Sequence, residues 1–151
     1  MAQRKSLADS SCPVARALDI VGERWALLIV RDAFDGVRRF GEFQESLDIA
    51  RNILTDRLRL LVEAGVLEVV PASDGSAYQE YVLTPKGEAL FPVIVTLRQW
   101  SEANLFTRGE KHSQLIDRVS GKPVPKLLLR SAGGIAPAPA STFVKKVATQ
   151  K

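Results

Sequence analysis

The chain has 151 residues, of which 46% are hydrophobic and 25% are charged, and its formal net charge is +4. This composition is typical of one folded globular domain with an appendage. A single cysteine cannot form an intrachain disulfide, so we expect a cytoplasmic protein. The sequence has no apolar run long enough for a signal peptide or a membrane span, and we predict no membrane contact.

The content of reactive residues disfavours most enzyme classes. The lone cysteine, Cys12, and the lone histidine, His112, are far apart in the sequence, and no Cys/His cluster has metal-ligand spacing. No glycine-rich loop followed by Lys-Ser/Thr is present to bind phosphate. We therefore predict no catalytic site, no metal and no cofactor. The modest positive charge is compatible with a nucleic-acid partner.

The N-terminal part of the sequence predicts an arm and two helices. Residues 1–10 have no apolar periodicity and are expected to form a flexible arm. A proline suits the first helical turn, so a helix is expected over residues 13–21, with Ser11 or Cys12 as its N-cap. Residues 24–34 are strongly apolar and predict a second, largely buried helix.

The next segment predicts a helix-turn-helix. Residues 40–47 have apolar side chains at helical spacing, and residues 51–64 form a longer amphipathic pattern that ends at Gly65. Only residues 48–50 separate them, which leaves room for a tight corner. The expected buried face of the second helix consists of Leu54, Leu58, Leu61 and Val62, with Ile53 and Leu60 on its flank.

The polar face of this second helix has side chains suited to reading DNA. Asn52 can pair with adenine, Arg59 can pair with guanine, and Thr55 can contact a thymine methyl. The alternative is a solvated face on which Asp56 and Arg59 form a local ion pair. Cations expected to contact DNA phosphates are Arg38, Arg39, Arg51 and Arg57, although Arg57 lies nearer the core and could instead form a structural ion pair.

After Gly65 the apolar period changes from 3.6 to about 2, which predicts a β-hairpin. Residues 66–70 and 78–83 are the two strands, and Asp74-Gly75 between them is a strong turn signal. A hairpin directly after a reading helix is the wing of a winged helix. The predicted fold class is therefore α+β, mainly α: a winged helix-turn-helix with a two-stranded wing and a long C-terminal dimerisation helix.

This long helix is expected from Pro85, with Thr84 as N-cap, to about residue 106. Pro92 must kink it or split it in two. Its apolar stripe exceeds what one small domain needs, so we expect it to pack, together with the first helix, against a second copy of the chain. The predicted interface residues are Leu18, Val21, Leu90, Val93, Ile94, Leu97 and Trp100.

Residues 11–106 are thus predicted to form the DNA-binding and dimerisation domain, and residues 107–151 a C-terminal extension. In the extension, residues 114–119 and 124–131 could pair as strands. Residues 133–141 read as a low-complexity linker, and the chain ends in a flexible basic tail.

An ordered set of motifs in this chain resembles the HxlR-type regulators, which are MarR-like winged-helix transcription factors. The motifs are Cys12-Pro13, LDIVGERW at 18–25, GVRRFGEF at 36–43, IARNILTDRL at 49–58, GVL at 65–67 and YVLTPKG at 81–87. The resemblance implies a homodimer that binds double-stranded operator DNA, usually as a repressor and sometimes as an activator. Two departures from the family pattern are a wing tip without a cation at residues 73–76 and Ala50, a poor cap, before the reading helix.

The resemblance also makes Cys12 a candidate redox sensor, because some members sense oxidants or electrophiles through a cysteine at this position. A thiol at a helix N-terminus meets unpaired amides that stabilise a thiolate, and Arg16 lies one turn along. The alternative is an inert cysteine retained for packing. The effector could also be a small molecule. A rival interpretation of the whole chain is a winged helix that binds protein instead of DNA, which the uncharged wing tip favours.

Overall fold

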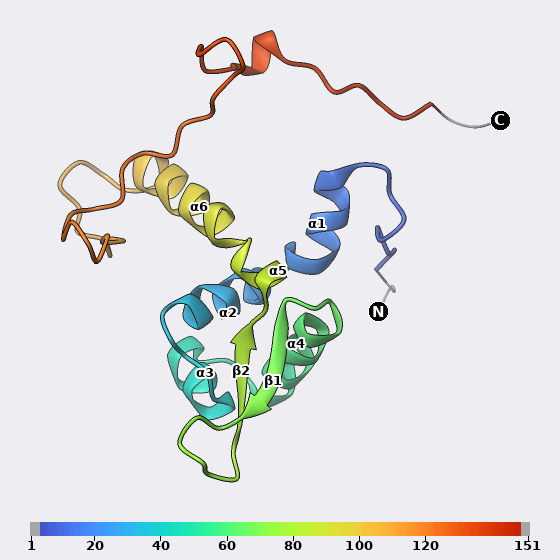
Figure 1. The fold of residues 1–151 in the computed structure, drawn as a ribbon, viewed down its shortest axis with the longest axis vertical. Coiled ribbons are helices and arrows are strands. Elements are labelled where there is room, and N and C mark those ends of the chain that lie inside the picture. The colour runs from blue at the N-terminus through green and yellow to red at the C-terminus, as the bar shows by residue number, and fades with distance from the viewer. Residues whose placement is uncertain (1–3, 149–151) are drawn as a thin grey trace. The chain divides into compact units, whose positions relative to one another are not determined.

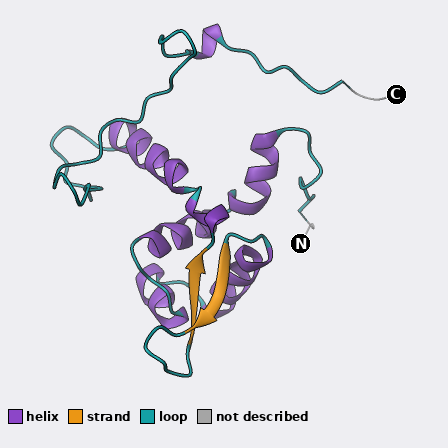
Figure 2. Cartoon of the chain, viewed as in Figure 1, coloured by secondary structure: helices purple, strands orange, loops and turns teal. Residues whose placement is uncertain are grey.

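The structure is a computed structural model that describes residues 4–148 (Figure 1). Helices dominate it, with one two-stranded antiparallel sheet (Figure 2). The elements are α1 (Pro13–Val21), α2 (Arg24–Phe34), α3 (Phe40–Leu47), α4 (Arg51–Glu63), β1 (Leu67–Pro71), β2 (Gln79–Leu83), α5 (Pro85–Glu88), α6 (Phe91–Asn104) and the 3-10 turn η1 (Pro139–Ser141). The α+β, mainly α, winged helix-turn-helix prediction is confirmed. Two compact units divide the chain, Met1–Ile94 and Val95–Lys151.

The core of the first unit lies between α2, α3, α4 and the hairpin. Leu54, Leu58 and Leu61 bury the apolar face of α4 as its helical spacing predicts. The largest fully buried side chains are Phe43, Ile29, Leu54, Leu58, Leu61, Leu67 and Val30. The buried face of α4 is narrower than expected, because Ile53 and Leu60 are 37% and 41% exposed.

The corner between α3 and α4 depends on one residue in a left-handed conformation. Asp48 ends α3 with φ 49° and ψ 47°, which reverses the chain within three residues. Ile49 then places its side chain in the core with 4% exposed. Ala50 caps α4 without a side-chain hydrogen bond, as its chemistry predicts. The helix that carries the predicted base-reading residues therefore follows a tight corner and lacks a side-chain cap.

The wing is a hairpin whose register runs from Leu67 opposite Leu83 to Pro71 opposite Gln79. Its base is fixed by the start of α5. Thr84 is the N-cap, as predicted, and accepts a hydrogen bond from the Gly87 amide. A Cβ at Gly87 would lie 2.1 Å from the Val66 carbonyl oxygen, so only glycine fits this close approach.

The expected long helix is split in two, which is one of the two outcomes predicted from Pro92. The first piece, α5, ends at Glu88, and Pro92 is the second residue of α6. Proline is well tolerated in a first turn because the amide it lacks has no partner within the helix there. Among residues 4–148, no helix combines the length and hydrophobicity that crossing a bilayer requires.

The C-terminal extension differs from its prediction. Within the described part of the extension, the possible strand pairing is limited to a single antiparallel bridge between Ile116 and Pro123, at the turn that the sequence suggested, and longer strands do not form there. The backbone instead bonds to α6: the Leu127 amide donates to Gln99 Oε1 at 2.7 Å, and Gln99 Nε2 donates to the Pro125 carbonyl at 3.0 Å. The prolines in this segment also lack the backbone N–H groups that strand pairing would need as hydrogen-bond donors.

These contacts place residues 95–106 in one compact unit with the extension, whereas the sequence grouped them with the winged core.

At the N-terminal end of the chain, the predicted arm is partly anchored. The Leu7 amide donates to Asp19 Oδ1 at 3.0 Å, and the Ser6 hydroxyl donates to Oδ2 of the same carboxylate. Residues 1–3 of the arm and residues 149–151 of the basic tail lie outside the described residues.

Candidate nucleic-acid interface

The outward face of α4 presents a compact set of polar side chains. Five residues line one shallow hollow on this face: Arg51, Asn52, Thr55, Asp56 and Arg59. The helical repeat brings Asn52, Thr55 and Arg59 together, since they follow one another at spacings of three and four residues. All three are exposed, while the opposite side of the helix is in the core. The three predicted base-reading residues therefore share one accessible surface.

Arg59 is held by two carboxylates of its own helix. Its Nη2 lies 2.6 Å from Asp56 Oδ1, and its Nη1 lies 2.9 Å from Glu63 Oε1. The hydrogen bonds from Asp56 and then Glu63 raise the pKa of the guanidinium. The ion pair with Asp56 was the alternative considered from the sequence; Glu63 adds a second partner one turn further along. The guanidinium is thus oriented before any DNA arrives.

Arg57 forms the structural ion pair that the sequence left open. Its Nε lies 3.0 Å from Glu23 Oε2, and its Nη1 lies 3.4 Å from Asp56 Oδ2. Glu23 also caps α2 by accepting a hydrogen bond from the Trp25 amide at 2.9 Å. This arginine therefore ties α4 to the start of α2. Arg51, by contrast, is exposed and lines the hollow, and its central guanidinium carbon lies 5.5 Å from the centroid of the Phe40 ring.

Arg38 and Arg39 connect the entrance of α3 with the wing. The Tyr81 amide donates to the Arg38 carbonyl at 2.7 Å, and Arg38 Nη1 lies 3.8 Å from Glu80 Oε2. Arg39 Nη2 lies 2.5 Å from Asp74 Oδ2 at the wing tip. The wing tip has no cation of its own, but the fold brings Arg39 to it from 35 residues earlier in the chain.

Two carboxylates hold the wing loop in one conformation. Glu80 is buried, with 3% exposed, and accepts hydrogen bonds from the Ser73 amide and hydroxyl at 2.5 and 2.8 Å. These bonds, the amide first, lower the pKa of the Glu80 carboxyl. Asp74 accepts from the Ser76 amide at 2.9 Å. The roles of Glu80 and Asp74 were missed because both depend on partners brought together only by the folded hairpin.

The fold and the exposed α4 face agree with a match across most of the chain. The family model described as HxlR-like helix-turn-helix covers residues 20–109, which include the helix-turn-helix and the wing. The chain belongs to this family. It is therefore a transcriptional regulator with a helix-turn-helix DNA-binding domain, as the motifs in its sequence predicted.

Relatives and solved structures agree with the HxlR-like assignment. An uncharacterised HTH-type transcriptional regulator of Mycobacterium tuberculosis, Rv3095, is 41% identical in an alignment of 143 residues that covers 90% of this chain and 90% of that one. The crystal structure of the candidate transcription factor PA1607 is 53% identical with a TM-score of 0.88, over 93% of this chain and 99% of that one. Reduced YodB from Bacillus subtilis is 29% identical with a TM-score of 0.54, over 66% and 98% of the two chains.

Cys12 is exposed at the N-cap of α1, where the sequence placed it. Its carbonyl accepts the first hydrogen bond of the helix from the Arg16 amide at 3.1 Å. The Arg16 side chain donates a hydrogen bond from its Nε to the Ser10 carbonyl, two residues before Cys12. The thiol of the candidate sensor is therefore accessible, and the Arg16 guanidinium is hydrogen-bonded to the backbone.

The residues predicted for the dimer interface fall into two groups. Val21 is buried with 8% exposed, and Leu90 and Ile94 pack against the core of the first unit. These three already have partners within the chain. The other four are 40–57% exposed on α1 and α6: Leu18, Val93, Leu97 and Trp100.

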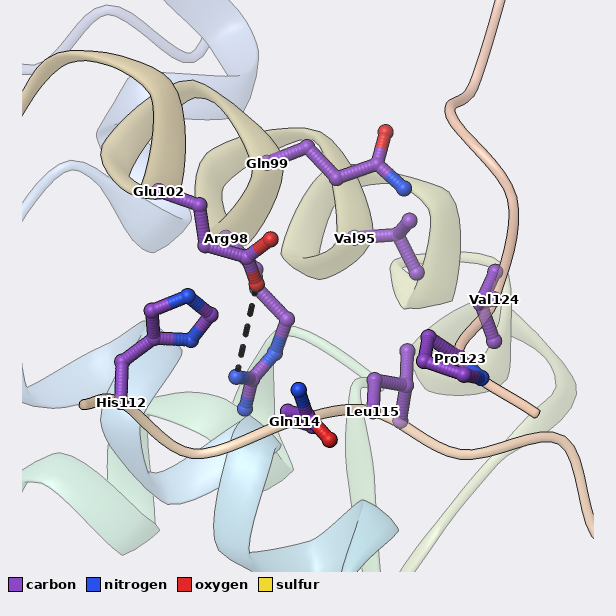
Figure 3. A pocket seen from close by; sticks show the side chains of 9 residues that line it. All are labelled: Val95, Arg98, Gln99, Glu102, His112, Gln114, Leu115, Pro123 and Val124. Atoms are coloured by element: carbon purple, nitrogen blue, oxygen red, sulfur yellow. Dashed lines mark ion pairs between the residues drawn. The ribbon is translucent and has the colours of Figure 1, made fainter. Parts of the chain in front are cut away.

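A second hollow lies within the Val95–Lys151 unit, between α6 and the extension (Figure 3). Its charged groups are engaged with each other and with the backbone. Arg98 Nη1 donates to the Ser113 carbonyl and hydroxyl, each at 2.9 Å, and lies 3.9 Å from Glu102 Oε1. The arrangement favours a structural contact over a ligand site. Residues 4–148 contain no cluster of three or more potential metal ligands.

Proposed function

We propose that this chain is a sequence-specific repressor that acts as a homodimer on a pseudo-palindromic operator. The observation that carries the proposal is the exposed α4 face, on which Asn52, Thr55 and Arg59 line one hollow. An asparagine amide can bond both the N6 and N7 positions of adenine, and an arginine can bond O6 and N7 of guanine. These contacts require a helix in the major groove.

Arg38, Arg39 and Arg51 are proposed to contact phosphates on either side of this groove. All three lie at the starts of the two helices of the helix-turn-helix, where backbone amides also favour anions. A two-fold dimer places two copies of α4 on one side of the duplex. The operator is therefore expected to have two inverted half-sites about one helical turn apart, or a multiple of that distance.

The proposal is tested by footprinting the full-length protein on the DNA upstream of its own gene and on random duplex of equal length. We expect two protected segments related by a two-fold axis, and a preference for the upstream DNA that persists as salt is raised. Deletion of the gene should raise transcription of the bound promoter. A single unrepeated footprint would contradict the dimeric operator, and lowered transcription would contradict repression.

We further propose that Cys12 makes the regulator responsive to oxidants. The supporting observations are its exposed thiol at a helix start and the likeness to YodB and to a structure described as the redox regulator HypR, which is 30% identical with a TM-score of 0.57. As the sole cysteine, it can form only a bridge to a second copy or a mixed disulfide with a small thiol.

A Cys12→Ser variant is expected to bind the operator as the unmodified protein does, but to keep that affinity after treatment with an oxidant and a small thiol. The unmodified protein should lose or gain affinity under the same treatment, with the adduct on Cys12 visible by mass spectrometry. A response of equal size in both proteins would show that the thiol is not the sensor.

A further inference from the structure

The wing tip carries an acidic group placed against a cation that is proposed to bind DNA. Arg39 is the N-cap residue of α3, and its guanidinium lies between the Asp74 carboxylate and the Tyr78 ring, with its central carbon 5.2 Å from the ring centroid. Both partners come from the wing loop. Arg39 is therefore occupied from two sides in the free protein.

The Asp74 carboxylate is arranged for this contact. One oxygen accepts from the Ser76 amide, which leaves the other directed at Arg39. Ser76 first, and then Arg39, hold the pKa of the carboxyl well below its usual range, so it is ionised at neutral pH. The loop that bears it is itself fixed at its base by the buried Glu80, through the hydrogen bonds from Ser73. Asp74 thus presents an ionised carboxylate directly to the Arg39 guanidinium.

We propose that Asp74 limits the affinity of the protein for DNA of any sequence by competing with DNA phosphate for Arg39. This inference rests on the proposed phosphate contact of Arg39. A carboxylate and a phosphate oxygen offer the same charge-assisted bond to a guanidinium. Arg39 must therefore exchange one anion for another when DNA binds, and the released carboxylate remains near the negatively charged backbone.

The consequence is a higher threshold for stable binding. When a protein cation neutralises one DNA phosphate, the logarithm of the binding constant falls more steeply with the logarithm of the salt concentration, by about 0.9 in slope. A cation that is already paired with a carboxylate of its own protein adds little to the attraction between protein and DNA. Only a sequence that adds base contacts through α4 then holds the protein firmly at cellular salt.

The test is an Asp74→Asn variant, which keeps the shape of the side chain and removes its charge. We expect its affinity for random duplex DNA to rise about eightfold near 0.1 M salt, and its salt dependence to steepen by roughly one phosphate. Retention on heparin should increase in parallel. The control is Glu88→Gln, which removes an exposed carboxylate in α5, at the end of β2 away from the wing loop.

A double-variant cycle with Arg39→Ala separates competition from a general change in charge. In the Arg39→Ala background, Asp74→Asn should change affinity no more than Glu88→Gln does. The proposal is overturned if Asp74→Asn acts no more strongly than the control, or if its effect is the same with and without Arg39. These measurements use random DNA, so they stand apart from the operator: absence of any preference for the protein's own upstream DNA would overturn the proposed function and leave this result intact.

Discussion

A Trp100→Glu variant is expected to be monomeric at micromolar concentrations where the unmodified protein is a dimer. Val93, Leu97 and Trp100 recur at spacings of four and three residues, so they form one stripe on α6 that is 40–57% exposed. Full burial of such a side chain is worth roughly 1.5–3 kcal/mol, and about half of that free energy is still available because about half of each side chain is exposed. In a two-fold dimer each contact occurs twice, so the summed gain can exceed the free-energy cost of association.

The Trp100→Glu substitution would place a carboxylate from each copy in the proposed interface without compensating partners, which is costly. Operator affinity should fall roughly 100-fold or more, because linked half-site readers gain about 10²–10⁴ in avidity. Val119→Glu is the matched control, since Val119 is 98% exposed in the extension and should tolerate the charge. Sedimentation that finds the unmodified protein monomeric at micromolar concentration would refute the dimer.

An Arg59→Ala variant is expected to lose about 10- to 100-fold in affinity for the operator, because it removes the bidentate contact to guanine that we propose for this arginine. The loss on random DNA should be much smaller. Because Asp56 and Glu63 would remain on the face after their partner is removed, some of the loss in this variant is repulsion of the DNA by those two carboxylates.

Arg59→Lys separates the two effects. Lysine keeps the positive charge beside Asp56 and Glu63 but lacks the planar fork that matches a guanine edge. We expect this variant to bind random DNA as the unmodified protein does and to lose its preference for the operator. Arg108→Ala, which removes an exposed arginine from the second unit, is the control. Equal losses on operator and random DNA in Arg59→Lys would remove Arg59 from the base-reading set.

The helix-turn-helix and the wing could be predicted because their determinants are local. The bounds of α2 and α3 follow from apolar spacing, and the hairpin follows from a period of two around Asp74-Gly75. The exposed face of α4 could be predicted for the same reason, since a helix fixes which side chains share a side. Helical spacing alone was enough to predict that three side chains are neighbours on this face, namely Asn52, Thr55 and Arg59.

What could not be predicted depends on contacts between distant segments. The pairing of Arg39 with Asp74 requires the hairpin to fold back beside the entrance of α3, and no spacing in the sequence reveals it. The structure of the extension likewise depends on contacts that are distant in the sequence. Its apolar pattern predicts strands, but Gln99 takes the hydrogen bonds at Pro125 and Leu127 that a neighbouring strand would have used.

The two carboxylates that hold Arg59 also bear on how quickly an operator is found. A regulator must pass over a very large number of wrong sites, and the time it spends at each one sets the duration of the search. If Arg59 reads guanine as we propose, it gains no such contact at a wrong site to compensate for leaving Asp56 and Glu63, and it then stays paired on its own helix while the protein slides past. The pairing therefore implies short stops along the chromosome and a long stop only where the sequence draws Arg59 away.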